Sequence, residues 1–353
     1  MVDAPALPRC NSFQAGGGLA PHFAKPFVVS SPHKVSDPDR IIHAVRDDAG
    51  VMKDKLIYIT SPSYSGSTLL TILLAEHPAV ATIGELKASA FGDIERYCCS
   101  CGTRLLDCSY WQRLEQRLRP NNPTFDLRNW RTHFAGGGRV THKLLSATLR
   151  PPLAESMRSL GQTLVPDARH RFDATLELNA AVMSAVLEEA QATTFLDGSK
   201  DPVRAKYFLD SDRWDMTVVA LIRDGRGVTN SYMQHESTDM ATALDRWLGK
   251  MQEIERLEAV AGSRFIVTRY EDLCADPLAE CNRILAAAGL PELDELAFPI
   301  VADDRHILGN SMRLKRLDAV RSDEKWRNCL SEADLDAFWD RAEAVQNRFG
   351  YAR

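Results

Sequence analysis

The chain has 353 residues, of which 44% are hydrophobic and 26% are charged, with a formal net charge of −5. This composition is ordinary for a globular protein, and the length suits one large α/β domain or two small ones. The mildly acidic balance argues against a broad nucleic-acid-binding surface. The sequence has no run of about 18 apolar residues, so we expect no transmembrane helix.

Residues 1–52 are predicted to form a disordered tail, because they combine Gly16-Gly17-Gly18, several prolines and little periodicity. They contain no apolar segment of signal-peptide length, so a cytoplasmic location is expected. The catalytic domain is predicted to span residues 53–353. Nothing in the sequence predicts an oligomeric state.

The first predicted strand, residues 56–60, leads into a small polar segment, residues 65–69 (Ser-Gly-Ser-Thr-Leu), and then into a helix. Gly66 lets a ligand approach the backbone closely, and the helix start offers free N–H groups and a positive dipole end. The segment therefore predicts a phosphate or sulfate site. It lacks the Lys of a Walker A loop, which weakens a kinase or ATPase interpretation. The alternative is that Ser and Thr only cap the helix.

Residues 86–175 are predicted to be irregular and variable, covering the active site and selecting the acceptor. Strands and helices alternate after this region. The predicted elements are a helix at 176–191, a strand at 193–196, a helix from 202, a strand at 216–222, helices to 260, a strand at 264–268 and helices at 277–289 and 332–349. This alternation predicts an α/β fold with a parallel sheet covered by helices.

The strand at 216–222 ends at Arg223, and Ser231 follows eight residues later, about two turns along a helix. The carboxyl ends of parallel strands bind ligands in open α/β sheets, and an Arg fork suits a phosphate. The segment therefore predicts a second phosphate contact. The alternative is a local ion pair between Arg223 and Asp224.

Together these two segments resemble the sulfotransferases that use 3′-phosphoadenosine 5′-phosphosulfate (PAPS). Further matches follow in family order at 198–202 (Gly-Ser-Lys-Asp-Pro), 269–273 (Arg-Tyr-Glu-Asp-Leu), 306–313 and 326–328, so that the resemblance covers roughly residues 55 to 350. It implies a P-loop-like sulfotransferase fold and transfer of a sulfuryl group from PAPS to an acceptor hydroxyl, with no metal required.

The resemblance also implies which residues bind the cofactor. These are Tyr64, Ser65, Gly66, Ser67, Thr68, Leu69, Arg223, Ser231, Tyr270 and Arg313. Tyr64 departs from the family pattern, because most relatives carry Lys or Arg at this position. Tyrosine has no positive charge at pH 7, so Lys200 is the candidate to supply the missing charge. The departure also leaves open a non-catalytic protein that binds the product nucleotide, adenosine 3′,5′-bisphosphate (PAP).

Glu85 is the predicted general base, because Gly84-Glu85 resembles the Gly-Glu of tyrosylprotein sulfotransferases after a one-residue shift. His142 is the second candidate, from a fainter likeness to the Lys-Thr-His of phenol and steroid sulfotransferases. Lys200 is predicted to stabilise the charge on the transferred group and the leaving phosphate. The alternative interpretation makes Glu85 a surface residue and Lys200 a solvated one.

The acceptor is predicted to be a hydroxyl of a carbohydrate, glycolipid or small metabolite. A protein tyrosine is the second choice, and a nucleotide kinase is a further alternative function.

Of the eight cysteines, four gather at Cys98, Cys99, Cys101 and Cys108. They could hold zinc or form a disulfide, but free thiols are favoured, because adjacent cysteines fit paired C-x₂-C spacing poorly and disulfides are rare in the cytosol.

Overall fold

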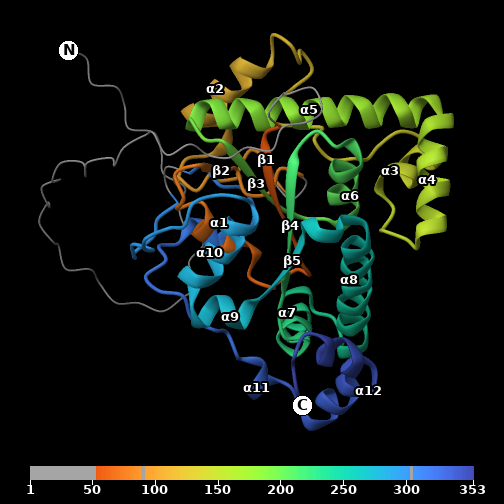
Figure 1. Ribbon diagram of the computed structural model, residues 1–353, viewed down its shortest axis with the longest axis vertical. Helices are drawn as coiled ribbons and strands as arrows, with labels where there is room; N and C mark the ends of the chain where they lie inside the picture. Colours follow the sequence, from red (N-terminus) through yellow and green to blue (C-terminus); the bar gives the residue numbers. More distant parts are fainter. Residues whose placement is uncertain (1–52, 89–91, 303–304) are drawn as a thin grey trace, which may run out of the picture.

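The computed structural model describes residues 53–88, 92–302 and 305–353 (Figure 1). The predicted tail at 1–52 lies outside them. One five-stranded sheet has the order β2-β3-β1-β4-β5, with parallel pairing throughout. The strands are β1 (Lys55–Thr60), β2 (Val80–Thr82), β3 (Thr194–Lys200), β4 (Asp215–Ile222) and β5 (Phe265–Arg269). The predicted α/β class with a helix-covered parallel sheet is confirmed.

Helices connect the strands and form the chain's last element. They are α1 (Ser67–Leu74), α2 (Ser109–Leu118), α3 (Arg139–Ser146), α4 (Pro152–Leu164), α5 (Pro166–Ala190), α6 (Pro202–Ser211), α7 (Gly225–Glu236), α8 (Met240–Ala261), α9 (Tyr270–Ala275), α10 (Pro277–Ala287), α11 (Trp326–Cys329) and α12 (Glu332–Arg348). Short 3₁₀ turns lie at Leu105–Asp107, Gly262–Arg264 and Ser311–Leu314. None of the helices in these described stretches is long and apolar enough to cross a membrane.

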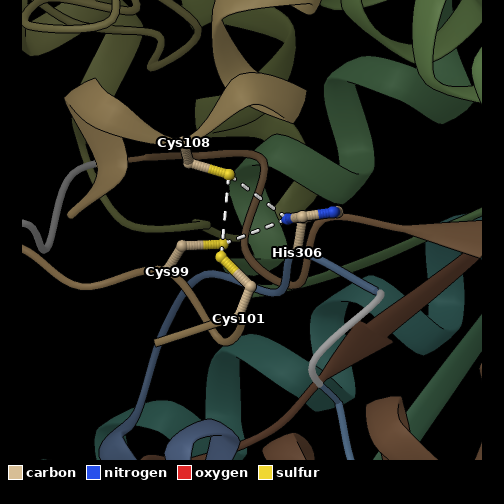
Figure 2. Close-up of side chains that lie close together, drawn as sticks. All are labelled: Cys99, Cys101, Cys108 and His306. Carbon is tan, nitrogen blue, oxygen red and sulfur yellow. Dashed lines mark hydrogen bonds between the residues drawn. The ribbon is translucent and has the colours of Figure 1, made fainter. Parts of the chain in front are cut away.

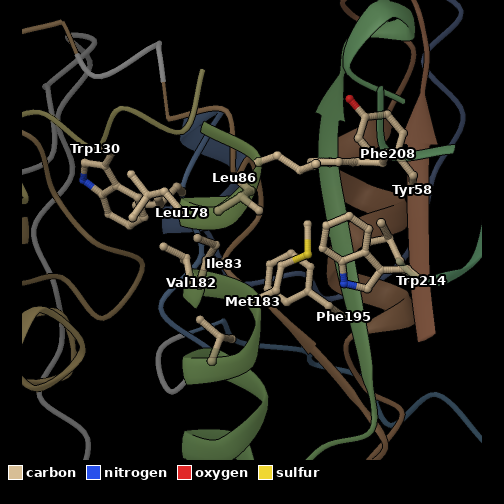
Figure 3. Close-up of a cluster of buried hydrophobic side chains, with 14 of the residues drawn as sticks. Tyr58, Ile83, Leu86, Trp130, Leu178, Val182, Met183, Phe195, Phe208 and Trp214 are labelled. Atoms are coloured by element: carbon tan, nitrogen blue, oxygen red, sulfur yellow. The ribbon is translucent and has the colours of Figure 1, made fainter. Parts of the chain in front are cut away.

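The two faces of the sheet bury different side chains, because successive residues of a strand point to opposite sides. Leu56 and Tyr58 of β1 join a core with side chains of α5 and α6, part of which Figure 3 shows. Ile57 and Ile59 join a second core with α1 and α10. Figure 1 shows α9 and α10 on the opposite side of the sheet from α6 and α8. All strands run in one direction, so their carboxyl ends share one edge.

The prediction that residues 86–175 are irregular was wrong, because α2, α3, α4 and the start of α5 lie within them. The predicted helix at 176–191 begins already at Pro166, and α4 begins at Pro152. Proline at a first helical position fixes a suitable φ and needs no N–H partner, so Pro152 and Pro166 start helices inside the region predicted to be irregular. The strand β2 has only three residues and gave no recognisable pattern.

Candidate active site

The loop between β1 and α1, together with the first two residues of α1, is called the phosphate loop here and spans residues 61–68. Gly66 is the N-cap of α1, with φ +89° and no side chain capping the helix. The alternative that Ser and Thr only cap this helix is therefore wrong. The first bond into the helix runs from Leu70 N to Gly66 O (3.0 Å), which leaves the preceding N–H groups outside the helical pattern.

Two hydroxyls of the phosphate loop are buried without a hydrogen-bond partner in the described part of the chain, Ser61 Oγ and Ser65 Oγ. Buried hydroxyls without partners are rare in native proteins. Together with the free N–H groups and the positive end of α1, they form a cradle that suits an oxyanion. The phosphate loop therefore suits a phosphate or sulfate group.

Tyr270, at the start of α9, packs directly on the phosphate loop. A Cβ at Gly66 would lie 2.7 Å from Tyr270 Cδ2, so only glycine fits beneath this ring. The guanidinium of Arg223 lies 4.7 Å from the centre of the same ring, within cation–π range. The segments that follow β1, β4 and β5 thus meet around one tyrosine.

Arg223 lies buried at the end of β4. Its Nη1 donates to Tyr64 O (2.8 Å) and its Nη2 to Asp323 O (2.5 Å), while the Asp323 carboxylate lies 3.6 Å from Nη2. Ser231 Oγ donates to Gly227 O (2.8 Å), and a Cβ at Gly227 would lie 3.0 Å from Arg223 Nε. Arg223 and Ser231 therefore both contact Gly227 in the first turn of α7.

The predicted alternative for Arg223, an ion pair with its neighbour Asp224, is wrong. Asp224 caps α7 and pairs instead with Arg226 (2.7 Å), and Gln346 Nε2 also donates to its carboxylate (2.9 Å). This local network satisfies Asp224 without Arg223. The Arg223 fork keeps its orientation toward the phosphate loop.

Tyr64 points along α7. Its hydroxyl donates to Glu236 Oε1 (3.1 Å), and its ring stacks on His235 (5.3 Å between centroids) and meets Tyr232 edge-on (5.1 Å). Burial, and then the bond to Glu236, raise the pKa of Tyr64 to about 12. Tyr64 is therefore neutral at pH 7 and supplies no cation in place of the family's Lys or Arg.

Glu85 and Lys200 form an ion pair, in which Lys200 Nζ lies 2.5 Å from Glu85 Oε1. The Lys200 side chain is 23% exposed and the Glu85 side chain is 20% exposed. Lys200 ends β3 with φ +65°, a left-handed conformation uncommon for a residue with a side chain. Thr60 Oγ1 donates to Lys200 O (3.3 Å), which fixes the pair beside the start of the phosphate loop. The structure thus brings together two of the three predicted catalytic residues.

The third predicted catalytic residue, His142, lies exposed on α3, where its Nδ1 accepts from Gly136 N (3.4 Å).

Arg313 is buried beside the candidate base. It donates to Gly309 O (2.5 Å) and Cys98 O, and its guanidinium covers the Tyr97 ring. These contacts hold residues 305–314, called the C-terminal loop here. The role of Arg313 in cofactor binding stays a prediction.

Glycine positions show how closely the C-terminal loop approaches Glu85. A Cβ at Gly84 (φ +80°) would lie 2.2 Å from Leu308 O, and one at Gly309 would lie 2.9 Å from Glu85 Oε1. Leu308 N also donates to Ile83 O (2.7 Å). The C-terminal loop therefore forms one wall around the candidate base.

Asp197 was missed by the sequence analysis, although a carboxylate inside the apolar strand β3 was a signal. It is fully buried, and its Oδ1 accepts from Leu86 N (3.2 Å) and Ser199 N (3.0 Å). Its other oxygen accepts from Arg204 Nε (3.1 Å), which balances the buried charge. Asp197 thereby ties the backbone after Glu85 to the backbone before Lys200 and acts as a positioning residue.

Lys87, two residues after Glu85, lines a cavity of about 1020 Å³. Residues of the predicted variable region form most of its lining. Polar and charged members include Asn121, Asn122, Thr124, Arg128, Asn129, Arg131, His133, Asp167, His170 and Arg171. These side chains offer hydrogen-bond donors and acceptors to a bound molecule.

His133, in this cavity wall, makes the stability of the fold depend on pH. Burial, and then Lys87, lower the pKa of His133 from 6.5 to about 4. The folded state therefore binds this proton less readily than the unfolded state, so stability present above pH 6.5 is lost as the pH falls toward 4. We expect His133→Asn to flatten the decline of urea-unfolding midpoints over this range. An exposed control, His170→Asn, should keep the wild-type slope, and an equal slope in all three proteins would refute the assignment.

The sequence model of the sulfotransferase family matches residues 103–295, more than half of the chain. The chain belongs to the sulfotransferase family. The matched residues include Lys200, Arg223 and Tyr270 but neither Glu85 nor the phosphate loop. Among curated proteins, no sequence matches this one significantly.

Solved structures of bacterial sulfotransferases resemble this one at low identity. The sulfotransferase domain of the Synechococcus PCC 7002 olefin synthase is 18% identical with a TM-score of 0.45, and the alignment covers 88% of this chain and 99% of that domain. Sulfotransferase STF9 from Mycobacterium avium is 14% identical with a TM-score of 0.45, covering 86% of this sulfotransferase and 79% of STF9.

Proposed function

We propose that this sulfotransferase uses PAPS and transfers its sulfuryl group to the hydroxyl of a polar acceptor. The observation that carries the proposal is the Glu85–Lys200 pair beside the phosphate loop. It places a carboxylate and an ammonium group at the sheet edge where the oxyanion cradle lies. Sulfuryl transfer needs these three elements: a base, a cation and an anion site.

The proposed cofactor site has two ends. The phosphate loop, with Ser65, Gly66 and the hydroxyls of Ser67 and Thr68, would hold the 5′-phosphosulfate, and Arg223 with Ser231 would hold the 3′-phosphate. Bound PAPS supplies the activated sulfuryl group and a phosphate leaving group. Tyr270 packs between both ends and keeps them in register.

Glu85 is proposed to accept the proton of the acceptor hydroxyl, and Lys200 to stabilise negative charge on the oxygens next to the transferred group. Their ion pair orients the Glu85 carboxylate, and Asp197 fixes both backbones. Tyr64 carries no positive charge, and its hydroxyl is bonded to Glu236. Lys200 can therefore supply the positive charge that is missing at Tyr64.

The polar cavity beside Lys87 favours a carbohydrate or a small polar metabolite as acceptor. A protein tyrosine remains the alternative acceptor, and a cytoplasmic location remains a prediction. One observation favours a second function: the neutral Tyr64 points away along α7, as it could in a protein that binds PAP without catalysis.

Calorimetry with PAP, compared with ATP plus Mg²⁺, tests the proposal. We expect micromolar PAP binding without metal and no response to ATP. Transfer from radiolabelled PAPS to a panel of carbohydrates, small alcohols and tyrosine peptides then tests catalysis. Absent PAP binding would overturn the cofactor assignment. PAP binding without transfer to any acceptor class would favour the non-catalytic function.

A further inference from the structure

Four potential metal ligands converge between the segment before α2 and the C-terminal loop. The sulfurs of Cys99, Cys101 and Cys108 and a ring nitrogen of His306 all lie within 4.8 Å of one another (Figure 2). These four residues are called the Cys–His cluster here. Figure 2 shows their side chains pointing toward a common centre.

Three distances between ligand atoms of the cluster match the edges of a zinc tetrahedron. Bonds of about 2.3 Å to sulfur and about 2.0–2.1 Å to nitrogen at tetrahedral angles give edges of about 3.8 Å between sulfurs and about 3.5 Å from sulfur to nitrogen. Cys101 Sγ lies 3.7 Å from Cys108 Sγ. His306 Nδ1 lies 3.4 Å from Cys99 Sγ and 3.5 Å from Cys108 Sγ. We propose that the Cys–His cluster binds one Zn²⁺ ion.

The predicted cysteine group differs from the observed one by one member. Cys98 Sγ faces Arg96 O (3.7 Å) outside the cluster, and His306, 198 residues from Cys108, takes its place. The predicted free thiols are found at Cys99, Cys101 and Cys108, whereas Cys98 is disulfide-bonded. The long-range histidine completes a Cys₃His set, which is a standard structural zinc site.

Neighbouring groups orient the ligands as in a metal centre. Trp111 Nε1 donates to Cys99 Sγ (3.2 Å). The Tyr110 ring stacks on the His306 ring, with 4.2 Å between the ring centroids and 6° between the ring planes. A bond from an N–H group to sulfur stabilises a thiolate, the form that binds zinc. Zinc binding would displace the protons of the three thiols, which pass to solvent.

All four tetrahedral positions would be filled by protein, so the ion has a structural role. It would fasten the segment at 99–108 to the C-terminal loop, the loop that walls Glu85. Ile307 N also donates to Ser100 Oγ (2.9 Å), so both segments already meet at this point. This inference stands independently of the PAPS assignment.

Metal analysis of the full chain, purified under reducing conditions and loaded with zinc, tests the site. We expect one zinc ion per chain after desalting. Cobalt loading of chelator-stripped protein should give intense visible absorption of a tetrahedral thiolate site, and stripping should lower the melting temperature. Cys101→Ser and His306→Gln should each weaken zinc binding by more than the about 10- to 100-fold loss caused by outer-shell changes. The exposed Cys329, changed to Ser, is the matched control and should bind zinc as wild type.

Two outcomes would overturn the site. The first is a reduced wild-type chain that is folded by circular dichroism yet takes up neither zinc nor cobalt. The second is wild-type zinc affinity in both Cys101→Ser and His306→Gln. Because the first comparison uses only the wild-type protein, a variant that fails to fold does not remove the test.

Discussion

Glu85→Gln is expected to lower the rate of sulfuryl transfer by about 10²- to 10⁴-fold, while PAP affinity stays at the wild-type value. The amide keeps the shape of the side chain and can still accept from Lys200, which lies 2.5 Å away. It cannot take a proton from the acceptor hydroxyl. Single-turnover transfer from labelled PAPS and calorimetry with PAP measure the two quantities separately.

Two variants sharpen this comparison. Glu343→Gln, on the exposed face of α12, makes the same chemical change far from the sheet edge and should keep full activity. His142→Asn should also keep most activity, because His142 lies exposed on α3 and bonds only to Gly136 N among the contacts of its ring described above. The reverse pattern, an active Glu85→Gln and an inactive His142→Asn, would identify His142 as the base.

Arg223→Ala is expected to weaken PAP binding by about 10- to 150-fold, the equivalent of about 1.5–3 kcal/mol for a charge-assisted hydrogen bond. Arg223 is buried and offers its fork beside the phosphate loop. It also bonds to Tyr64 O and Asp323 O, so thermal unfolding must show that the variant is folded. Arg223→Lys keeps the charge but not the fork and should bind PAP with intermediate affinity.

A substitution at Asp323 is expected to raise the affinity for PAP instead of lowering it. Its carboxylate lies 3.6 Å from Arg223 Nη2, where it would repel the 3′-phosphate of PAP. Asp323→Asn should therefore bind PAP more tightly, whereas Asp336→Asn, at the exposed ion pair with Arg353, should bind it as wild type. Unchanged PAP affinity in both Arg223→Ala and Asp323→Asn would place the 3′-phosphate elsewhere.

The sequence determined the features that depend on neighbours along the chain. Apolar runs predicted β1 and β4, because a strand buried on both faces needs apolar residues throughout. Gly66 and the polar residues around it predicted the phosphate loop, since left-handed backbone and free N–H groups are local properties. The order of several short motifs also predicted the family, which the match over 103–295 confirms.

Tertiary structure decided which distant side chains meet. Glu85 and Lys200, 115 residues apart, form a pair only because β2 lies beside β3 and Asp197 bonds to both segments. His306 joins the cysteines across about 200 residues, beyond any spacing rule. Sequence patterns report periodicity and local conformation, whereas these contacts depend on strand order and loop packing, which no short segment encodes alone.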